Sequence, residues 1–194
     1  MRGLEAHIYG QHVPDVIVAL GGDDVVEAGD GDDVVCGGPG DDTLKGGPGD
    51  DVLIGGSGHD SLHGQAGNDT LVGNTGQDRL IGGTGGDRLH GGPDNDVLRG
   101  GPGTDILRGG DGSDLLAGGE GHDRIFGGSG PDRLAGHDGN DTLNGQTGDD
   151  WLCGGPGADI LNGGLGRNTI RGRQEEDRII IPKARLKRQA LIVP

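Results

Sequence analysis

A nine-residue repeat runs through most of the chain without an insertion or a deletion. Eighteen copies of the pattern G-G-x-G-x-D-x-U-x, in which U is an aliphatic residue, extend from Gly10 to Arg171. The eighth position is Ile, Val or Leu in all eighteen copies, and the sixth is Asp in seventeen, with Asn168 the exception. A fixed period over this length is typical of a solenoid, in which each repeat packs against its neighbours along one axis.

The composition does not support a rounded hydrophobic core. Of the 194 residues 48 are Gly, 29% are hydrophobic and only Tyr9, Phe126 and Trp151 are aromatic, while the formal net charge is -16. Low hydrophobicity with a high net charge is typical of a disordered chain, but a random polar sequence does not keep an aliphatic residue every nine positions. We therefore expect a chain that is disordered alone and folds when its acidic groups are neutralised.

The sequence also argues against several classes of protein. No apolar run approaches about 18 residues, so no transmembrane segment is expected, and residues 1–10 lack the apolar stretch of a signal peptide. Four Lys and Arg residues between positions 183 and 188 form a basic tail, which is too small beside an acidic body to make a nucleic-acid groove. The expected organisation is a short lead-in at residues 1–9, the repeats at 10–171, and a degenerate last repeat with a C-terminal cap and the basic tail at 172–194.

The repeat predicts its own local structure. Gly at the first, second and fourth positions permits backbone angles that other residues avoid, so G-G-x-G-x-D is expected to turn. The last three residues, x-U-x, alternate outward, inward and outward, which indicates a very short strand. Two nonapeptides then complete a coil of eighteen residues, and stacked coils give an all-β fold, a parallel β-roll of two sheets with the aliphatic residues between them.

Stacked turns place the sixth-position carboxylates in two columns, one along each edge of the roll. Asp42 and Asp60 belong to one column, and Asp33 and Asp51 to the other. A buried aliphatic side chain contributes roughly 1.5–3 kcal/mol, whereas ordering nine residues costs on the order of 1 kcal/mol or more for each. Carboxylates beside turn carbonyls make an all-oxygen site that suits Ca²⁺ better than Mg²⁺. We therefore expect folding to be coupled to calcium binding.

These residues resemble the haemolysin-type calcium-binding repeats, also called repeats-in-toxin (RTX), over positions 10 to 171. The resemblance implies an extracellular parallel β-roll that binds several Ca²⁺ ions through the sixth-position Asp and the turn carbonyls. The implied metal ligands are Asp24, Asp33, Asp42, Asp51, Asp60, Asp69, Asp78, Asp87, Asp96, Asp105, Asp114, Asp123, Asp132, Asp141, Asp150 and Asp159. The first repeat lacks two of its Gly residues and the last carries Asn168, so calcium sites are expected to fade at both ends.

The repeat phase argues against a catalytic site. His63 and His90 are three repeats apart, an odd number, which places them on opposite sheets. Cys36 and Cys153 are thirteen repeats apart, which also separates them and excludes a disulfide between them. With no cluster of reactive side chains and no expected pocket, the chain is predicted not to be an enzyme.

One outer face differs from the rest. On the sheet built by alternate repeats from Gly10, the outward side chains are Val16, Val18, Val34, Cys36, Val52, Ile54 and Val72. This apolar stripe indicates either short-strand β-propensity or a docking face for a protein partner or a missing N-terminal domain. A structural calcium-binding module is the favoured interpretation. An adhesion protein that uses its outer sheets, and the C-terminal fragment of a secreted toxin, protease or lipase, stay open as alternatives.

Overall fold

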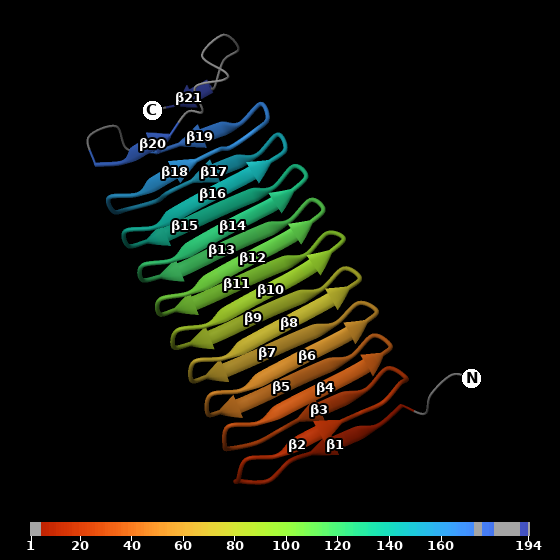
Figure 1. Ribbon diagram of the computed structural model, residues 1–194. Helices are drawn as coiled ribbons and strands as arrows, with labels where there is room; N and C mark the ends of the chain where they lie inside the picture. The colour runs from red at the N-terminus through yellow and green to blue at the C-terminus, as the bar shows by residue number, and fades with distance from the viewer. Residues whose placement is uncertain (1–4, 173–175, 181–190, 194) are drawn as a thin grey trace.

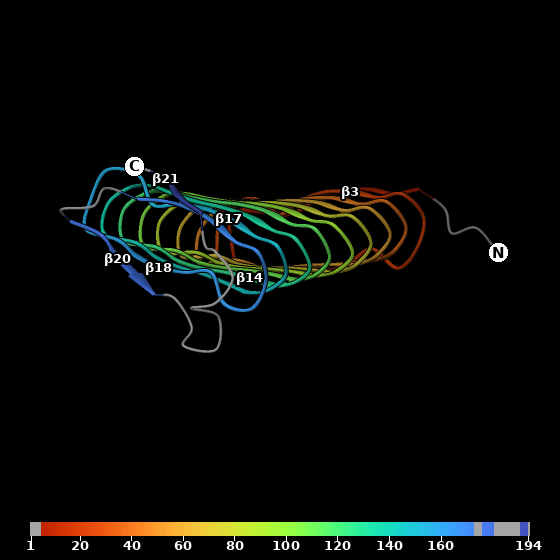
Figure 2. The ribbon, with the colours of Figure 1, turned by 90° about the horizontal axis from the view of Figure 1, so that it is seen from above.

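The protein is a two-sheet solenoid. The computed structural model describes residues 5–172, 176–180 and 191–193. The described strands form two parallel sheets that face each other (Figure 1). Seen along the stack, the coils are flattened loops whose long sides are the two sheets (Figure 2). The expected all-β parallel β-roll with eighteen residues per coil is confirmed.

Successive strands alternate between the sheets, so that odd-numbered strands form one sheet and even-numbered strands form the other. The eleven-stranded sheet contains β1 (His7–Tyr9), β3 (Val25–Glu27), β5 (Thr43–Pro48), β7 (Ser61–Ala66), β9 (Arg79–Thr84), β11 (Val97–Pro102), β13 (Leu115–Glu120), β15 (Arg133–Asp138), β17 (Trp151–Cys153), β19 (Thr169–Arg171) and β21 (Leu191–Val193). The ten-stranded sheet contains β2 (Val16–Val18), β4 (Val34–Pro39), β6 (Val52–Ser57), β8 (Thr70–Thr75), β10 (Arg88–Pro93), β12 (Ile106–Asp111), β14 (Arg124–Ser129), β16 (Thr142–Thr147), β18 (Ile160–Asn162) and β20 (Arg178–Ile180).

The aliphatic residues at the eighth position form the core. Each pairs in register with the residue eighteen positions away, as Leu53 does with Leu71. From Val26 to Ile170 these side chains are at most 2% exposed. Every layer of the core therefore holds one aliphatic side chain from each sheet, and this thin core gives the turns a large share in the stability of the fold.

The central strands are twice as long as the sequence predicts. From β4 to β16 each has six residues rather than three, because the strand continues through the first three positions of the next repeat. Gly38 pairs with Gly56 and Pro39 with Ser57 along this extension. The backbone bends at the second position, where Gly38 has φ 112°. The pairing survives because the neighbouring coils bend at the same position, and the turn shrinks to positions four, five and six.

The ends of the solenoid are strands as well. In the lead-in, β1 pairs in register with β3, and Ile8 packs against the core. In the degenerate last repeat β20 pairs with β18, and β21 pairs with β19. The basic tail between positions 183 and 188 lies outside the described residues.

The apolar stripe lies on the outer face of the ten-stranded sheet, as the repeat phase predicts. Its N-terminal part is the most exposed, with Val16 at 79%, Val18 at 57% and Val34 at 40% exposure. A partner for this face stays a prediction. No helix in the described ranges is long and apolar enough to cross a membrane.

Candidate metal centre

The sixth-position Asp residues lie at the last position of each turn, immediately before a strand. The first column, which contains Asp42 and Asp60, follows the even-numbered strands. The second column, which contains Asp33 and Asp51, follows the odd-numbered strands. From Asp24 to Asp159 all of these residues are buried, with at most 2% of each exposed. The structure therefore brings the sixteen predicted ligands together as two internal columns, one along each edge.

One carboxylate oxygen of each Asp holds the neighbouring coil. The backbone N–H of Asp42 donates to Oδ1 of Asp60 (2.8 Å), and the N–H of Asp60 donates to Oδ1 of Asp78 (2.8 Å). The second column repeats the contact, as between Asp51 and Asp69 (2.8 Å). Hydrogen bonds from a backbone N–H to an ionised carboxylate are stronger than neutral ones. Each sixth-position Asp therefore links two coils before any metal is considered.

The other carboxylate oxygen is left without a partner. Oδ2 is buried and accepts no hydrogen bond in the fifteen sixth-position Asp residues from Asp24 to Asp150. A buried acceptor without a partner is costly, and an ionised one more so. Unpaired buried oxygens at the same place in fifteen successive repeats fit a set of cation sites.

The first Gly of the repeat makes room for this carboxylate. A Cβ added at Gly37 would meet Oδ2 of Asp42, and the carbonyl oxygen of Gly55 in the next coil lies 2.8 Å from the same point. No positive φ occurs at Gly37, whereas Gly38 and Gly40 have φ values of 112° and 144°. The prediction that the first Gly is needed for its backbone angles is therefore wrong. It is needed because the carboxylate of its own repeat occupies the space of a side chain.

Turn carbonyls supply further oxygen atoms. The carbonyl oxygens at the fourth position, from Gly22 to Gly157, accept no backbone hydrogen bond within the described turns. They point along the stack, so that a Cβ added at Gly58 would meet the carbonyl of Gly40. Within the described ranges no three His, Cys, Asp or Glu side chains come close enough to hold a metal ion. A cation at the turns therefore depends on backbone carbonyls as well as on the carboxylates.

Burial raises the pKa of the sixth-position carboxyls from Asp42 to Asp150. For Asp96 the loss of solvation is the largest cause, and the hydrogen bond from the N–H of Asp78 opposes it by lowering the pKa. The charges of Asp114, Asp78 and Asp94 raise the pKa further. The pKa rises to about 6 in two carboxyls, Asp51 and Asp141, and to about 7 in five, Asp60, Asp69, Asp96, Asp105 and Asp132. Ionisation at neutral pH therefore opposes folding unless a cation balances the charge.

The fifth position carries a second set of contacts that the sequence analysis missed. The N–H of His59 donates to Oδ1 of Asp41 (2.7 Å), and the N–H of Gln77 donates to Nδ1 of His59 (2.8 Å). This contact runs toward the N-terminal coil, opposite to the sixth-position contact. The signal was the presence of Asp, Asn or His, which have an acceptor close to the backbone, in ten of the eighteen fifth positions.

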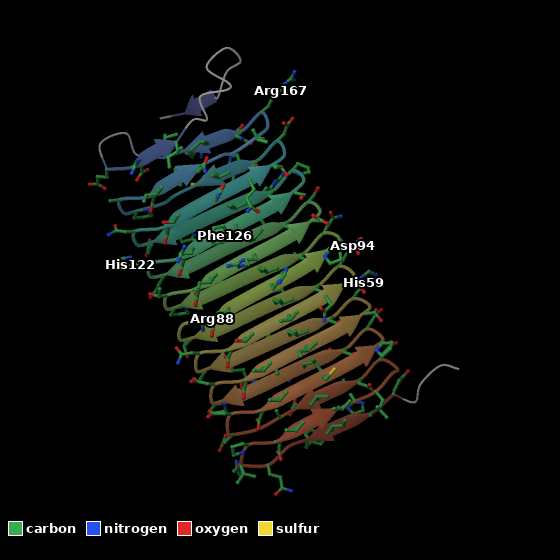
Figure 3. All side chains as sticks on the ribbon, viewed as in Figure 1. His59, Arg88, Asp94, His122, Phe126 and Arg167 are labelled. Carbon is green, nitrogen blue, oxygen red and sulfur yellow. The ribbon has the colours of Figure 1, made fainter. Side chains whose placement is uncertain are left out.

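The histidines and cysteines do not gather at a site. His63 lies in β7 and His90 in β10, on different sheets, and Cys36 in β4 and Cys153 in β17 are likewise separated. Both cysteines are free thiols. In Figure 3, His59 and Asp94 lie at one edge and His122 at the other.

The two ends of the columns depart from the central pattern. Oδ2 of Asp15 accepts a hydrogen bond from the N–H of Gln11 (2.7 Å) and the residue is half-buried. Asn168 still accepts the N–H of Asp150 through Oδ1 (2.9 Å) but carries no charge. In the first repeat the carboxylate is therefore already hydrogen-bonded within its own repeat. In the last repeat Asn168 keeps the hydrogen bond between coils but has no carboxylate.

The comparison with known families agrees with this geometry. The family described as the RTX calcium-binding nonapeptide repeat matches the chain in overlapping segments. The matched segments are residues 14–44, 45–80, 72–107, 81–116, 99–134, 117–152, 135–170 and 153–180. No curated protein matches the chain.

Proposed function

The chain belongs to the family of RTX calcium-binding nonapeptide repeats, and from this we propose that it binds Ca²⁺ along both edges and folds only when calcium is bound. The proposed ligands are the sixth-position carboxylates from Asp24 to Asp159 together with turn carbonyls. The observation that carries the proposal is the buried Oδ2 without a partner in fifteen successive repeats. Bound Ca²⁺ supplies the positive charge that these oxygens lack.

Electrostatics within each column supports metal-coupled folding. Carboxylates in adjacent coils are roughly 4.8 Å apart along the strand-pairing direction, and two like charges near this distance repel by about 1 kcal/mol in water and by more at a lower effective dielectric. The core offers one aliphatic side chain per strand to offset this repulsion and the entropy of ordering Gly-rich turns. A cation between turns converts the repulsion into attraction, so that calcium binding and coil formation become one equilibrium.

The donor set favours calcium over other metals. The oxygens at the turns are carboxylate and carbonyl oxygens, which are hard ligands. Ca²⁺ accepts six to eight oxygens in irregular geometry, whereas Mg²⁺ requires a near-ideal octahedron. Zinc prefers Cys and His ligands, and the described Cys and His residues do not gather at the turns. These considerations support a site for Ca²⁺.

The biological role that fits is an extracellular structural module without catalytic activity of its own. Extracellular calcium modules work at about 10⁻⁴–10⁻³ M, so the chain stays unfolded at the low calcium level inside a cell and becomes a rod outside it. The apolar stripe at Val16, Val18 and Val34 favours a second candidate function, in which the rod is the repeat domain of an adhesion protein or of a longer secreted protein.

Circular dichroism of the purified chain tests the proposal. The spectrum is expected to be that of a disordered chain in EGTA, to change to β-structure on addition of Ca²⁺, and to respond little to Mg²⁺. A midpoint in the submillimolar to millimolar range supports an extracellular switch, and a midpoint below about a micromolar contradicts it. Identical β-spectra in EGTA and in Ca²⁺ would overturn metal-coupled folding.

A further inference from the structure

A groove runs along the outer face of the ten-stranded sheet, away from the calcium columns. Its volume is about 810 Å³, and it extends from Val72 in β8 to Thr147 in β16. Ninth-position side chains, including His90, Arg108 and Phe126, form one wall. Third-position side chains form the other wall, and between the two positions Gly residues form a floor without side chains in the middle coils, from Gly91 to Gly128. The groove is therefore open along the axis of the rod and suits a linear chain.

Arginines lie in and beside the groove, whose lining contains Arg108 and one acidic residue, Asp111. The guanidinium of Arg108 lies over the ring of Phe126 at 5.4 Å from its centroid, and that of Arg124 at 6.0 Å. Arg88 lies two coils from Arg124 in the same row of paired residues. Among the described residues the close contacts between a basic and an acidic side chain are His12–Asp30 and Lys45–Glu27, so none of these three arginines is paired with an acid. Figure 3 labels Arg88 and Phe126 on the sheet.

The charge of the chain is distributed unevenly along the rod. Fourteen of the 16 Lys and Arg residues lie beyond residue 78, all except Arg2 and Lys45. The sixth-position carboxylates are internal and are balanced by calcium under the proposed function. The outer surface of the middle coils is therefore much less acidic than the net charge of -16 suggests. An anionic ligand meets unpaired arginines there, with Asp111 as the one acidic residue that lines the groove.

From these observations we propose that the groove binds a linear acidic polysaccharide that bears carboxylate or sulfate groups. Arg108 in the groove and Arg124, which lies beside it over the ring of Phe126, bind the acidic groups, since guanidinium pairs well with carboxylate and with other oxyanions. The ring of Phe126 packs against the apolar face of a sugar. The amide side chains of Asn74 and Gln146 and the hydroxyl side chains of Ser129 and Thr147 in the groove provide partners for sugar hydroxyls.

A polysaccharide fits this face better than an acidic peptide does. Extended peptides bind to sheets through backbone hydrogen bonds at an exposed edge strand. Strands β8 to β16 each have a paired strand on both sides within the sheet, so none of them is an exposed edge strand. Recognition on this face therefore relies on side chains. Side chains can bind the hydroxyl and acidic groups of a polysaccharide.

The opposite sheet offers a matched control. Arg99 and Arg133 occupy the same repeat positions as Arg108 and Arg124, each nine residues away, and lie on the eleven-stranded sheet in β11 and β15. The groove on that side is smaller, about 610 Å³, and contains Arg79 and Arg99 together with Glu120 and Asp138 but no aromatic residue. Two double variants, R108Q/R124Q and R99Q/R133Q, therefore remove equal charge from the two faces.

The test is fluorescence anisotropy with end-labelled hyaluronate, which bears carboxylates, and chondroitin sulfate, which also bears sulfates, in saturating Ca²⁺. The full chain is expected to bind at least one of the two, with an affinity that falls as salt is added, and to ignore neutral dextran. R108Q/R124Q is expected to weaken binding at least tenfold, Phe126→Leu several-fold, and R99Q/R133Q less than twofold. The preferred polymer identifies the acidic group that the groove selects.

Several results would overturn the proposal. These are no binding to either polymer, an equal loss in both double variants, and binding of poly-L-glutamate as tight as that of the polysaccharides. A dimer seen by sedimentation that dissociates in R108Q/R124Q would assign the groove to a second copy of the chain instead. The proposal rests on the proposed function for a folded rod and for the calcium that balances the sixth-position carboxylates. Circular dichroism with and without Ca²⁺ therefore decides the calcium proposal separately from the binding result.

Discussion

Replacing Asp96 by Asn separates the two roles of a sixth-position carboxylate. Oδ1 of Asp96 accepts the N–H of Asp78 at 2.8 Å, and an Asn side chain can keep this contact, as Asn168 does in the last repeat. Oδ2 is buried without a partner and carries the charge that a calcium ion would balance. The substitution is therefore expected to act in opposite directions on the metal-free and the calcium-bound protein.

The magnitude follows from the pKa of this carboxyl. Burial raises the pKa of Asp96 from 3.8 to about 7, roughly three pKa units at about 1.4 kcal/mol each. Ionised Asp96 therefore opposes metal-free folding at pH 7.5 by on the order of 4 kcal/mol. An Asn at this position removes that penalty but buries an amide NH₂ that needs a partner, which costs about 1–3 kcal/mol. The net gain expected for the metal-free fold is on the order of 2 kcal/mol.

The assay is circular dichroism under two titrations. In EGTA, trimethylamine oxide favours the compact state because it is excluded from the protein surface, and Asp96→Asn is expected to fold at a lower concentration than the natural chain. In the calcium titration the variant is expected to need about tenfold more calcium, because the charge of the ligand set sets the affinity. Asp138→Asn removes an equal charge at an exposed third position and should change neither midpoint appreciably.

Two results would refute the reasoning. If Asp96→Asn raises the trimethylamine oxide midpoint in EGTA, the charge of Asp96 does not oppose folding, and the electrostatic argument fails. If the calcium midpoint is unchanged while that of Asp138→Asn shifts, calcium binds to the outer surface rather than to the columns.

Three further predictions follow from the same geometry. Acid should partly replace calcium, because burial raises the folded-state pKa of carboxyls such as Asp51 and Asp96. Their contribution to stability is complete below the unfolded pKa of 3.8 and is lost as pH rises through about 6 to 7. In EGTA the β-signal should therefore increase from pH 7.5 to pH 5, and no change would contradict this. Gly91→Ala should destabilise the calcium-bound rod by about 1–3 kcal/mol in thermal melts, because its Cβ meets the carboxylate of its own repeat. Gly86→Ala, where the nearest atom is 3.2 Å away, is the control and should cost less. Asp87→Ala should lower calcium affinity and cooperativity, whereas Asp15→Ala should do little because its carboxylate is already hydrogen-bonded; equal losses in calorimetry would contradict this.

The arrangement of the coils was predictable because the repeat contains no insertions. The eighth and sixth positions recur without a shift, so counting by nine places Leu53 in the core and Asp60 in a column. The odd number of repeats between Cys36 and Cys153 likewise separates them correctly. Periodicity fixes which residues share a sheet, an edge or the interior, and these are the features that the structure confirms.

Features that depend on contact distances could not be predicted from the repeat pattern. A pattern shows that the first Gly recurs, but not whether φ or a neighbouring atom requires it; at Gly37 the neighbouring carboxylate decides. Strand length was underestimated because pairing persists through a bend that all coils share at Gly38. The groove was missed because Arg108, Arg124 and Phe126 occupy variable positions of the repeat, and only the three-dimensional arrangement shows that both arginines lie over the ring of Phe126.

The alternation of sheets limits how such a rod can change length. A single nonapeptide inserted after Gly92 would transfer every later side chain to the other sheet. His90 would stay in place, whereas Arg108 and Phe126 would move to the opposite face. Two added nonapeptides would preserve all faces and lengthen the rod by one coil, roughly 4.8 Å. Insertions of eighteen residues therefore preserve the surface chemistry of the rod. Insertions of nine residues preserve only its core and its carboxylate columns.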